Sequence, residues 1–200
     1  MHPIRRLGRI AGMDRRRILL TGLAGIIAAC TPSLGTFNAL APRDSGGRRR
    51  ARDLPYGDGP RQTLDVYAPS GSANSGLPVV VFIYGGSWAS GAKADYAFVG
   101  AALSAQGFVT IIPDYRLVPE VRFPSFIEDC AAAVKWTLDH AAEFGGDPSR
   151  LVIVGHSAGA YNALMLALDG RYLNEVDATS VRGVVGLADR KSTRLNSSHS

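Results

Sequence analysis

The segment that most constrains the fold runs from Val152 to Gly159, where a short β-branched apolar run ends in Gly-His-Ser-Ala-Gly and small residues follow. This order predicts a buried strand, a sharp turn and a helix, with Ser157 at the turn. Glycine two residues on either side of the serine removes Cβ atoms that such a turn cannot accommodate. We therefore expect Ser157 to have a strained backbone and an exposed hydroxyl, with the N–H of Ala158 beside it.

Apolar runs alternate with helical segments along the rest of the chain. The expected strands cover residues 62–69, 77–84, 108–113, 151–154 and 181–188, and the expected helices cover residues 95–106, 125–143 and 158–168. The first of these strands alternates apolar and polar residues, as an edge strand does, whereas the next runs are nearly continuously apolar. The sequence therefore predicts an α/β fold whose mostly parallel sheet carries helices on both faces.

The net charge of +5 is concentrated at the two ends of the chain. Residues 1–52 carry a balance of +9, residues 53–188 one of −6, and residues 189–200 one of +2. Because the globular part is acidic, it has no basic patch for nucleic acid, and we expect no nucleic-acid partner. The two cysteines, Cys30 and Cys130, do not suggest a disulfide framework.

Residues 1–30 have the pattern of an export signal. A charged start, Asp14-Arg15-Arg16-Arg17, precedes the apolar segment Ile18–Ala29 and resembles a twin-arginine signal, opened by either Met1 or Met13. The apolar segment is shorter than a typical membrane span and fits the hydrophobic region of a signal peptide.

The end of this segment, Ile27-Ala28-Ala29-Cys30, resembles a bacterial lipoprotein signal, which implies lipidation of Cys30. A plain cleaved signal with an incidental cysteine, or an uncleaved anchor, are the alternatives. We expect an exported protein, either periplasmic or anchored in a membrane through an N-terminal lipid. Residues 31–52 are rich in Gly, Pro, Ser and Arg and are interpreted as a flexible linker.

A second glycine motif, Tyr84-Gly85-Gly86-Ser87-Trp88, follows the first buried strand. Two consecutive glycines allow backbone N–H groups to approach a ligand closely, because no Cβ intervenes. In an acyl-transfer site such groups would hold the negative oxygen of a tetrahedral intermediate. Taken alone, the motif is also compatible with an ordinary flexible loop.

Four motifs in order resemble the α/β-hydrolase fold, and specifically bacterial carboxylesterases related to the hormone-sensitive-lipase and feruloyl-esterase-like groups. They are Tyr84-Gly85-Gly86-Ser87-Trp88, Asp114-Tyr115-Arg116-Leu117 with Pro119, Gly146-Asp147-Pro148-Ser149-Arg150, and Gly155-His156-Ser157-Ala158-Gly159. The resemblance runs from about Tyr56 to Ala188. It departs from the family pattern at Tyr84, where the family more commonly has histidine.

The resemblance implies that Ser157 is the catalytic nucleophile. It also implies an oxyanion hole made by the N–H groups of Gly86, Ser87 and Ala158, with Gly85 as the alternative donor. The substrate would be a small-molecule ester, and neither a metal nor an organic cofactor is implied. Asp114 and Arg116 look like an acid–base pair, but we interpret their motif as structural.

The family order of the catalytic triad is serine, then an acid, then histidine. After Ser157 the only histidine is His199, and the acids are Asp169, Glu175, Asp177 and Asp189. None has the placement after a late strand that the family requires, so we do not assign His199 as the base.

The abrupt change to polar residues after Ala188 suggests why the triad acid and histidine are missing. Codons for residues 189–200 can be written to resemble a sequencing-library adapter, which makes this segment an artefact in our interpretation; a natural polar tail is the alternative. We therefore expect residues 53–188 to be a C-terminally truncated hydrolase domain, without the triad acid and histidine and inactive as it stands. An amidase or peptidase of the same fold, or a non-catalytic binding member, are the alternative functions.

Overall fold

The computed structural model describes residues 45–71, 75–174 and 178–187, and the elements named here belong to these ranges. The predicted signal segment with Cys30, and the polar segment with His199, lie outside them. The strands are β1 (Gly47–Pro55), β2 (Thr63–Pro69), β3 (Leu77–Ile83), β4 (Val109–Pro113), β5 (Gly146–His156) and β6 (Val181–Leu187). The helices are α3 (Ala97–Ala105), α4 (Ser125–His140) and α5 (Ala158–Leu168), with short 3₁₀ helices η1 (Lys93–Tyr96), η2 (Ala141–Phe144) and η3 (Ala178–Ser180).

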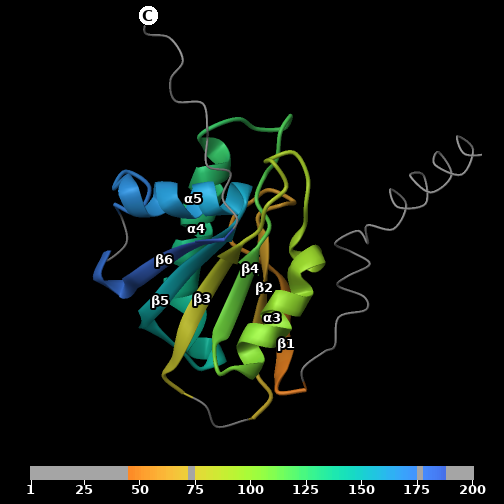
Figure 1. Ribbon diagram of the computed structural model, residues 1–200, viewed down its shortest axis with the longest axis vertical. Coiled ribbons are helices and arrows are strands. Elements are labelled where there is room, and N and C mark those ends of the chain that lie inside the picture. The colour runs from red at the N-terminus through yellow and green to blue at the C-terminus, as the bar shows by residue number, and fades with distance from the viewer. Residues whose placement is uncertain (1–44, 72–74, 175–177, 188–200) are drawn as a thin grey trace, which may run out of the picture.

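The six strands form one sheet in the order β1-β2-β4-β3-β5-β6 (Figure 1). β1 pairs antiparallel with β2, and β2 pairs antiparallel with β4. From β4 onward every neighbouring pair is parallel. The sheet is therefore mostly parallel, which confirms the expected fold class.

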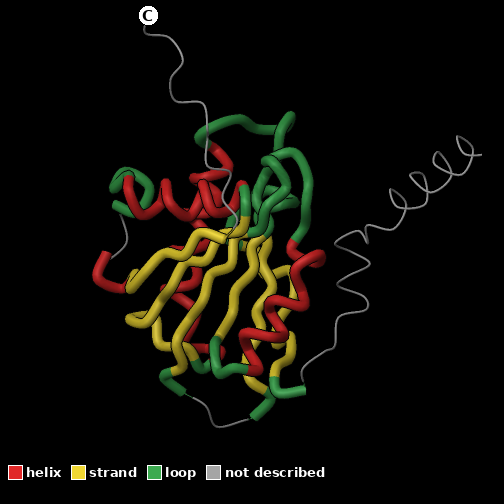
Figure 2. The backbone as a smooth tube through the Cα atoms, in the orientation of Figure 1, coloured by secondary structure: helices red, strands yellow, loops and turns green. Residues whose placement is uncertain are grey.

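Helices cover both faces of the sheet. α3 lies across one face over β1 and β2, whereas α4 and α5 lie on the opposite face (Figures 1 and 2). The central strands β3 and β4 are buried along nearly their whole length, because they have neighbours on both sides and helices on both faces. Continuous apolar runs at these positions follow from this double burial.

The first strand corrects the predicted domain boundary. β1 begins at Gly47, inside the segment interpreted as a linker over residues 31–52, and pairs with β2. Its run of arginines has the composition of a solvated segment. An edge strand tolerates that composition because only one side of its backbone is paired and most of its side chains are exposed.

The carboxyl ends of β3, β4 and β5 meet at one edge of the sheet. The glycine loop that follows β3, the loop that starts at Asp114 and the turn at Ser157 are therefore brought together from distant parts of the sequence. Crevices at this edge are where open α/β sheets bind ligands. None of the helices within the described ranges combines the length and the hydropathy that a bilayer crossing requires.

Candidate active site

Ser157 forms a sharp turn between β5 and α5. Its backbone has φ 53° and ψ −116°, a conformation that L side chains rarely adopt. Its N–H donates to the carbonyl of Leu187 at 2.9 Å, and its carbonyl accepts from the N–H of Ala160 at 3.0 Å. These bonds from β6 and α5 hold the strained residue in place.

The glycines that flank the serine lie where backbone segments approach most closely. A Cβ added to Gly155 would meet the carbonyl oxygen of Gly159 at 2.2 Å. One added to Gly159 would meet the carbonyl oxygen of Ile83 at 2.1 Å. Both contacts are with backbone, so no side-chain movement could relieve them. Glycine is therefore required for α5 to pack against the ends of β3 and β5.

The glycine loop lies directly against Ser157. A Cβ on Gly85 would come within 2.9 Å of the Cβ of Ser157, so the loop backbone runs beside the serine side chain. The next residues continue in a turn that glycine favours, with φ 138° at Gly86 and 54° at Ser87. Both predicted glycine motifs thus meet at one point.

The backbone N–H groups near Ser157 differ in whether they already have a hydrogen-bond acceptor. Burial raises the pKa of Tyr96, and the hydrogen bond that its hydroxyl accepts from the N–H of Gly85 opposes this rise. Within the described ranges, no hydrogen bond occupies the N–H groups of Gly86, Ser87 or Ala158. Those three N–H groups are therefore available to an added acceptor.

Trp88 fixes the middle of the glycine loop to α5. Its indole N–H donates to the side-chain oxygen of Asn162 at 2.9 Å, and its ring stacks on Phe126 at a centroid distance of 5.6 Å. Its carbonyl accepts from the N–H of Val118 at 2.8 Å. Asn162 itself is fully buried, so the indole is a well-defined partner.

Tyr84, which stands where the family more commonly has histidine, anchors the start of the loop. Its hydroxyl donates to Oδ1 of Asp114 at 2.8 Å and accepts from Arg61 at 2.8 Å. Burial, followed by the charge of Asp114, raises the pKa of Tyr84, so the hydroxyl remains a neutral donor. The substitution thus preserves a polar anchor for the loop.

Asp114 and Arg116 do not pair with each other. Asp114 accepts from the Lys93 backbone N–H at 2.7 Å and from its Nζ at 3.1 Å. Arg116 binds Asp129 through several hydrogen bonds, the shortest at 2.7 Å. Burial lowers the pKa of Lys93, but its bond to Asp53 and the charge of Asp114 outweigh this, and the net pKa is raised. Asp114 and Arg116 thus bind the loop after β4 to neighbouring elements.

No base contacts Ser157 among the described residues. His156 points to the hydroxyl of Tyr96, 3.1 Å from its Nδ1, and His140 pairs with Glu143 at 2.7 Å. Asp169 is engaged with Arg171. The other candidate triad residues after Ser157, namely Glu175, Asp177, Asp189 and His199, lie outside the described ranges. In the part of the chain described, no group of His, Cys, Asp or Glu side chains is arranged to hold a metal ion.

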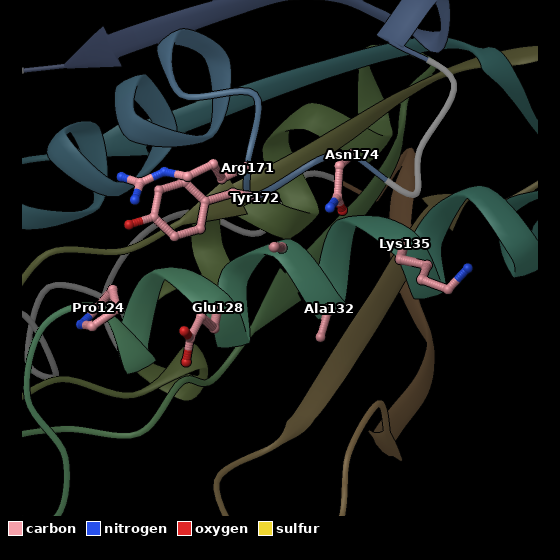
Figure 3. Close-up of a pocket in the computed structure, with 8 residues that line it drawn as sticks. Pro124, Glu128, Ala132, Lys135, Arg171, Tyr172 and Asn174 are labelled. Atoms are coloured by element: carbon pink, nitrogen blue, oxygen red, sulfur yellow. The ribbon is translucent and has the colours of Figure 1, made fainter.

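Two hollows differ in their relation to the elbow. The larger, about 440 Å³, lies between α4 and the segment after α5 (Figure 3). It is lined by Pro124, Glu128, Ala131, Ala132, Lys135, Arg171, Tyr172 and Asn174. The smaller, about 280 Å³, is apolar and adjoins the elbow through His156 and Leu187. Ser157 itself lines neither hollow.

Comparison with known proteins adds independent findings. The family model described as BD-FAE matches residues 64–186. Esterase LipC of Mycobacterium tuberculosis is 36% identical over 159 residues, which cover 76% of this chain and 39% of that protein. Carboxylesterase NlhH of the same organism is 43% identical over 93 residues, covering 46% and 29%. A probable isoprenylcysteine alpha-carbonyl methylesterase of Arabidopsis thaliana is 38% identical over 112 residues, covering 56% and 23%.

Solved structures share the fold. Esterase B from Lactobacillus rhamnosis superposes with a TM-score of 0.66 at 22% identity, covering 88% of this chain and 56% of that one. A bacterial heroin esterase superposes with a TM-score of 0.60 at 29% identity, covering 76% and 47%. The chain spans only 23 to 39% of the length of the three curated relatives.

Proposed function

Because the chain belongs to the BD-FAE family and has the α/β-hydrolase fold, we propose that it is the nucleophile-bearing part of a serine hydrolase that cleaves carboxylic esters. The observation that carries this proposal is the meeting of the two glycine motifs. The backbone of Gly85 runs against the side chain of Ser157, next to three N–H groups that no described residue occupies. A nucleophile beside free backbone donors is the arrangement that acyl transfer requires.

In the proposed reaction, Oγ of Ser157 attacks the ester carbonyl carbon while a base removes its proton. The carbonyl oxygen becomes negative in the tetrahedral intermediate, and the N–H groups of Gly86, Ser87 and Ala158 donate to it. Collapse of the intermediate breaks the bond to the alcohol, which takes the proton from the base. Water then attacks the acyl carbonyl while the base takes its proton. Collapse of this second intermediate releases the carboxylic acid, and Oγ of Ser157 takes the proton back from the base.

The base and its orienting acid are proposed to lie in sequence that continues the fold past the described residues. Two observations support this: neither described histidine contacts Ser157, and the curated relatives are much longer than this chain. Loss of both groups would remove most of the activation of the serine and leave only binding and the oxyanion hole. The substrate is proposed to be a small-molecule ester, in keeping with the names of the relatives.

The test is hydrolysis of a short-chain p-nitrophenyl ester together with labelling by a fluorophosphonate. The protein encoded by the complete genomic reading frame is expected to turn over the ester and to label, and Ser157→Ala should abolish both. Ser70→Ala is the matched control, because this exposed serine lies at the opposite end of the sheet and its hydroxyl donates to the carbonyl of Ser45. The 200-residue chain is expected to show no serine-dependent turnover.

Turnover that survives Ser157→Ala would contradict the proposal. Turnover by the 200-residue chain that disappears in Ser157→Ala would instead contradict the claim that the base lies elsewhere. A matched p-nitroanilide separates an esterase from an amidase of the same fold. Labelling without any turnover would favour a binding member.

We also propose export and lipid anchoring through Cys30. The support is the sequence pattern alone: a charged start, a short apolar segment and small residues before the cysteine. In a bacterial host, radiolabelled palmitate should enter the protein, and Cys30→Ser should prevent this. Equal incorporation in the two proteins would refute the lipid anchor.

A further inference from the structure

Arg61 joins three segments that are far apart in sequence. It lies in the turn between β1 and β2, and its Nη2 donates to the hydroxyl of Tyr84 and to the carbonyl of Gly91, each at 2.8 Å. Its Nε donates to the carbonyl of Tyr115 at 2.9 Å. Tyr84 and Gly91 are the two ends of the loop that contains the oxyanion donors. One guanidinium therefore bridges both ends of that loop.

The two ends of the loop are also in direct contact. A Cβ on Gly91, whose φ is 102°, would meet the carbonyl oxygen of Gly85 at 2.8 Å and the ring of Tyr84 at 3.0 Å. The loop from Tyr84 to Gly91 is therefore a closed turn, and Arg61 lies across its opening. A guanidinium suits this position because its planar donors have fixed directions and can serve several acceptors at once.

The charge of Arg61 is balanced locally. Oδ1 of Asp114 lies 3.7 Å from Nη2, and the same carboxylate accepts from the hydroxyl of Tyr84. Arg61, Tyr84 and Asp114 thus form a triangle of polar contacts around the start of the loop. The Arg61 side chain is 29% exposed, so solvent reaches the guanidinium from one side.

We propose that Arg61 is a positioning residue that holds the oxyanion loop closed against Ser157. The inference rests on the proposed function, because it assigns Arg61 to the donors of that reaction. Arg61 acts through the loop, since all its hydrogen bonds go to Tyr84, Gly91 and Tyr115.

The other anchors of the loop hold its start and its middle. At the start, the hydroxyl of Tyr115 donates to the carbonyl of Tyr84 at 2.9 Å. Trp88 is held in the middle by Asn162 and by Val118, and the N–H groups of Ala89 and Ser90 close a turn onto the carbonyl of Gly86. Removing the guanidinium would leave the hydroxyl of Tyr84 to Asp114 and release the carbonyl of Gly91. A displacement of about 1 Å in a reacting group can cost about a hundredfold in rate.

The first test measures the loop without relying on catalysis. Amide hydrogen exchange of the segment 84–91 in the 200-residue chain is compared between the unmodified protein and Arg61→Ala. Exchange of the Ala89 and Ser90 amides is expected to accelerate about tenfold or more, as local opening becomes easier. The matched control is Arg150→Ala, which removes an exposed arginine that donates to the carbonyl of Gly76 at 2.8 Å.

Unchanged exchange in Arg61→Ala would overturn the proposal, as would equal acceleration in Arg150→Ala. If the alanine variant does not fold, Arg61→Lys takes its place in the exchange experiment. It keeps the charge, but one ammonium replaces the planar fork, so intermediate exchange is expected. Exchange identical to that of the unmodified protein in a folded Arg61→Lys would show that the fork is not needed.

The second test uses the protein from the complete reading frame. Arg61→Ala is expected to lower kcat by about tenfold to a hundredfold while KM changes by less than about threefold, because the loop contacts the intermediate rather than the bound ester. Added guanidinium ion at millimolar concentration should restore part of kcat, which a general loss of stability would not allow.

An unchanged kcat in Arg61→Ala, with activity still abolished by Ser157→Ala, would overturn the assignment of Arg61. If the unmodified protein has no activity, the proposed function fails, and the exchange experiment alone then decides whether Arg61 clamps the loop. The two failures are therefore distinguishable.

Discussion

At the scale of the residue, the backbone of Ser157 stores strain at the point where the chemistry is proposed. Its φ of 53° and ψ of −116° lie in a region that glycine adopts readily and other residues do not. Such a residue costs about 1 to 3 kcal/mol and persists because its surroundings fix it. Here the bonds from Leu187 and Ala160 do so. A serine is therefore kept where glycine would be more stable.

This strain predicts different stabilities for two substitutions of Ser157. Ser157→Gly should raise the free energy of unfolding relative to Ser157→Ala by about 1 kcal/mol, since relief of strain exceeds the added freedom of glycine in the unfolded chain. Urea unfolding followed by circular dichroism measures the difference. A glycine variant less stable than the alanine variant would show that the turn is not strained.

At the scale of the element, α5 sits unusually close to the ends of two strands. The Gly159 backbone faces the carbonyls of Ile83 and Tyr84, which would lie 2.1 and 2.5 Å from an added Cβ. The helix, β3 and β5 are therefore locked together at the point from which both the nucleophile and the glycine loop emerge. A methyl group between these elements would move Ser157 away from its proposed oxyanion donors.

Gly159→Ala is accordingly expected to destabilise the protein by about 1 to 3 kcal/mol, the usual cost of overpacking a tight interface. Gly183→Ala is the matched control, because no atom lies within 4 Å of its added Cβ and its φ is ordinary. The measurement is the midpoint of thermal unfolding for both variants. Equal midpoints for the two alanine variants would contradict the close approach described for α5.

Most of these elements could be predicted from the sequence, because each carries its own local signal. The helix over residues 158–168 is confirmed with its predicted bounds, and strands appear wherever apolar runs predicted them. Two details were wrong: β2, predicted as an edge strand, lies between β1 and β4 and is buried, whereas β6 is an edge strand of the described sheet and is largely exposed. β5 is longer than predicted, because Gly146 already pairs with Leu77 of β3; residues 147–150 form an irregularity before Leu151 pairs with Val79. β1 was missed, since its pairing depends on β2 and not on its own composition.

The site could be predicted only in part, because some of its contacts depend on strand pairing and carry no local signal in the sequence. The two glycine motifs carry local signals, and the nearness of Gly85 to Ser157 follows from the parallel order of β3 and β5. Arg61 was missed because a single arginine in a Gly- and Pro-containing turn carries no signal. Its partners at Tyr84, Gly91 and Tyr115 become visible only once β2 pairs with β4 and the turn reaches the carboxyl edge of the sheet.

At the scale of the whole molecule, the core contains several ionisable groups that burial keeps neutral. Burial is the largest cause that raises the pKa of Tyr56, Tyr84 and Tyr115, and it also raises the pKa of the fully buried Cys130 thiol. Carboxylates hold the pKa of Lys93 above its usual range despite its desolvation. Each of these shifts raises the pKa of its group in the folded state.

The sign of these shifts predicts alkaline instability. A pKa raised in the folded state contributes stability that is complete below the unfolded pKa and is lost as pH rises above it. The ordinary values are about 8.5 for cysteine and about 10 for tyrosine and lysine, so the free energy of unfolding should fall from about pH 9 upward. Each group can contribute up to about 1.4 kcal/mol per pH unit.

Two measurements check this expectation. Urea unfolding between pH 8 and pH 11 should show a steady loss of stability, and part of the tyrosinate absorbance should appear only as the circular-dichroism signal is lost. If every tyrosine titrates while the fold is intact, the burial described for Tyr56, Tyr84 and Tyr115 is wrong. A free energy of unfolding that stays constant to pH 11 would contradict the direction of the shifts.

The arrangement of Arg61 has a consequence for the order in which the chain is synthesised. Arg61 and its acceptors at Tyr84, Gly91 and Tyr115 all precede Ser157 in sequence, and β1, β2, β4 and β3 are adjacent in the sheet. A ribosome therefore produces the oxyanion loop and the arginine across its opening before β5 exists. Because folding proceeds from the N-terminus during synthesis, the nucleophile can arrive last, on a strand added to the free edge of β3 beside a loop already in place.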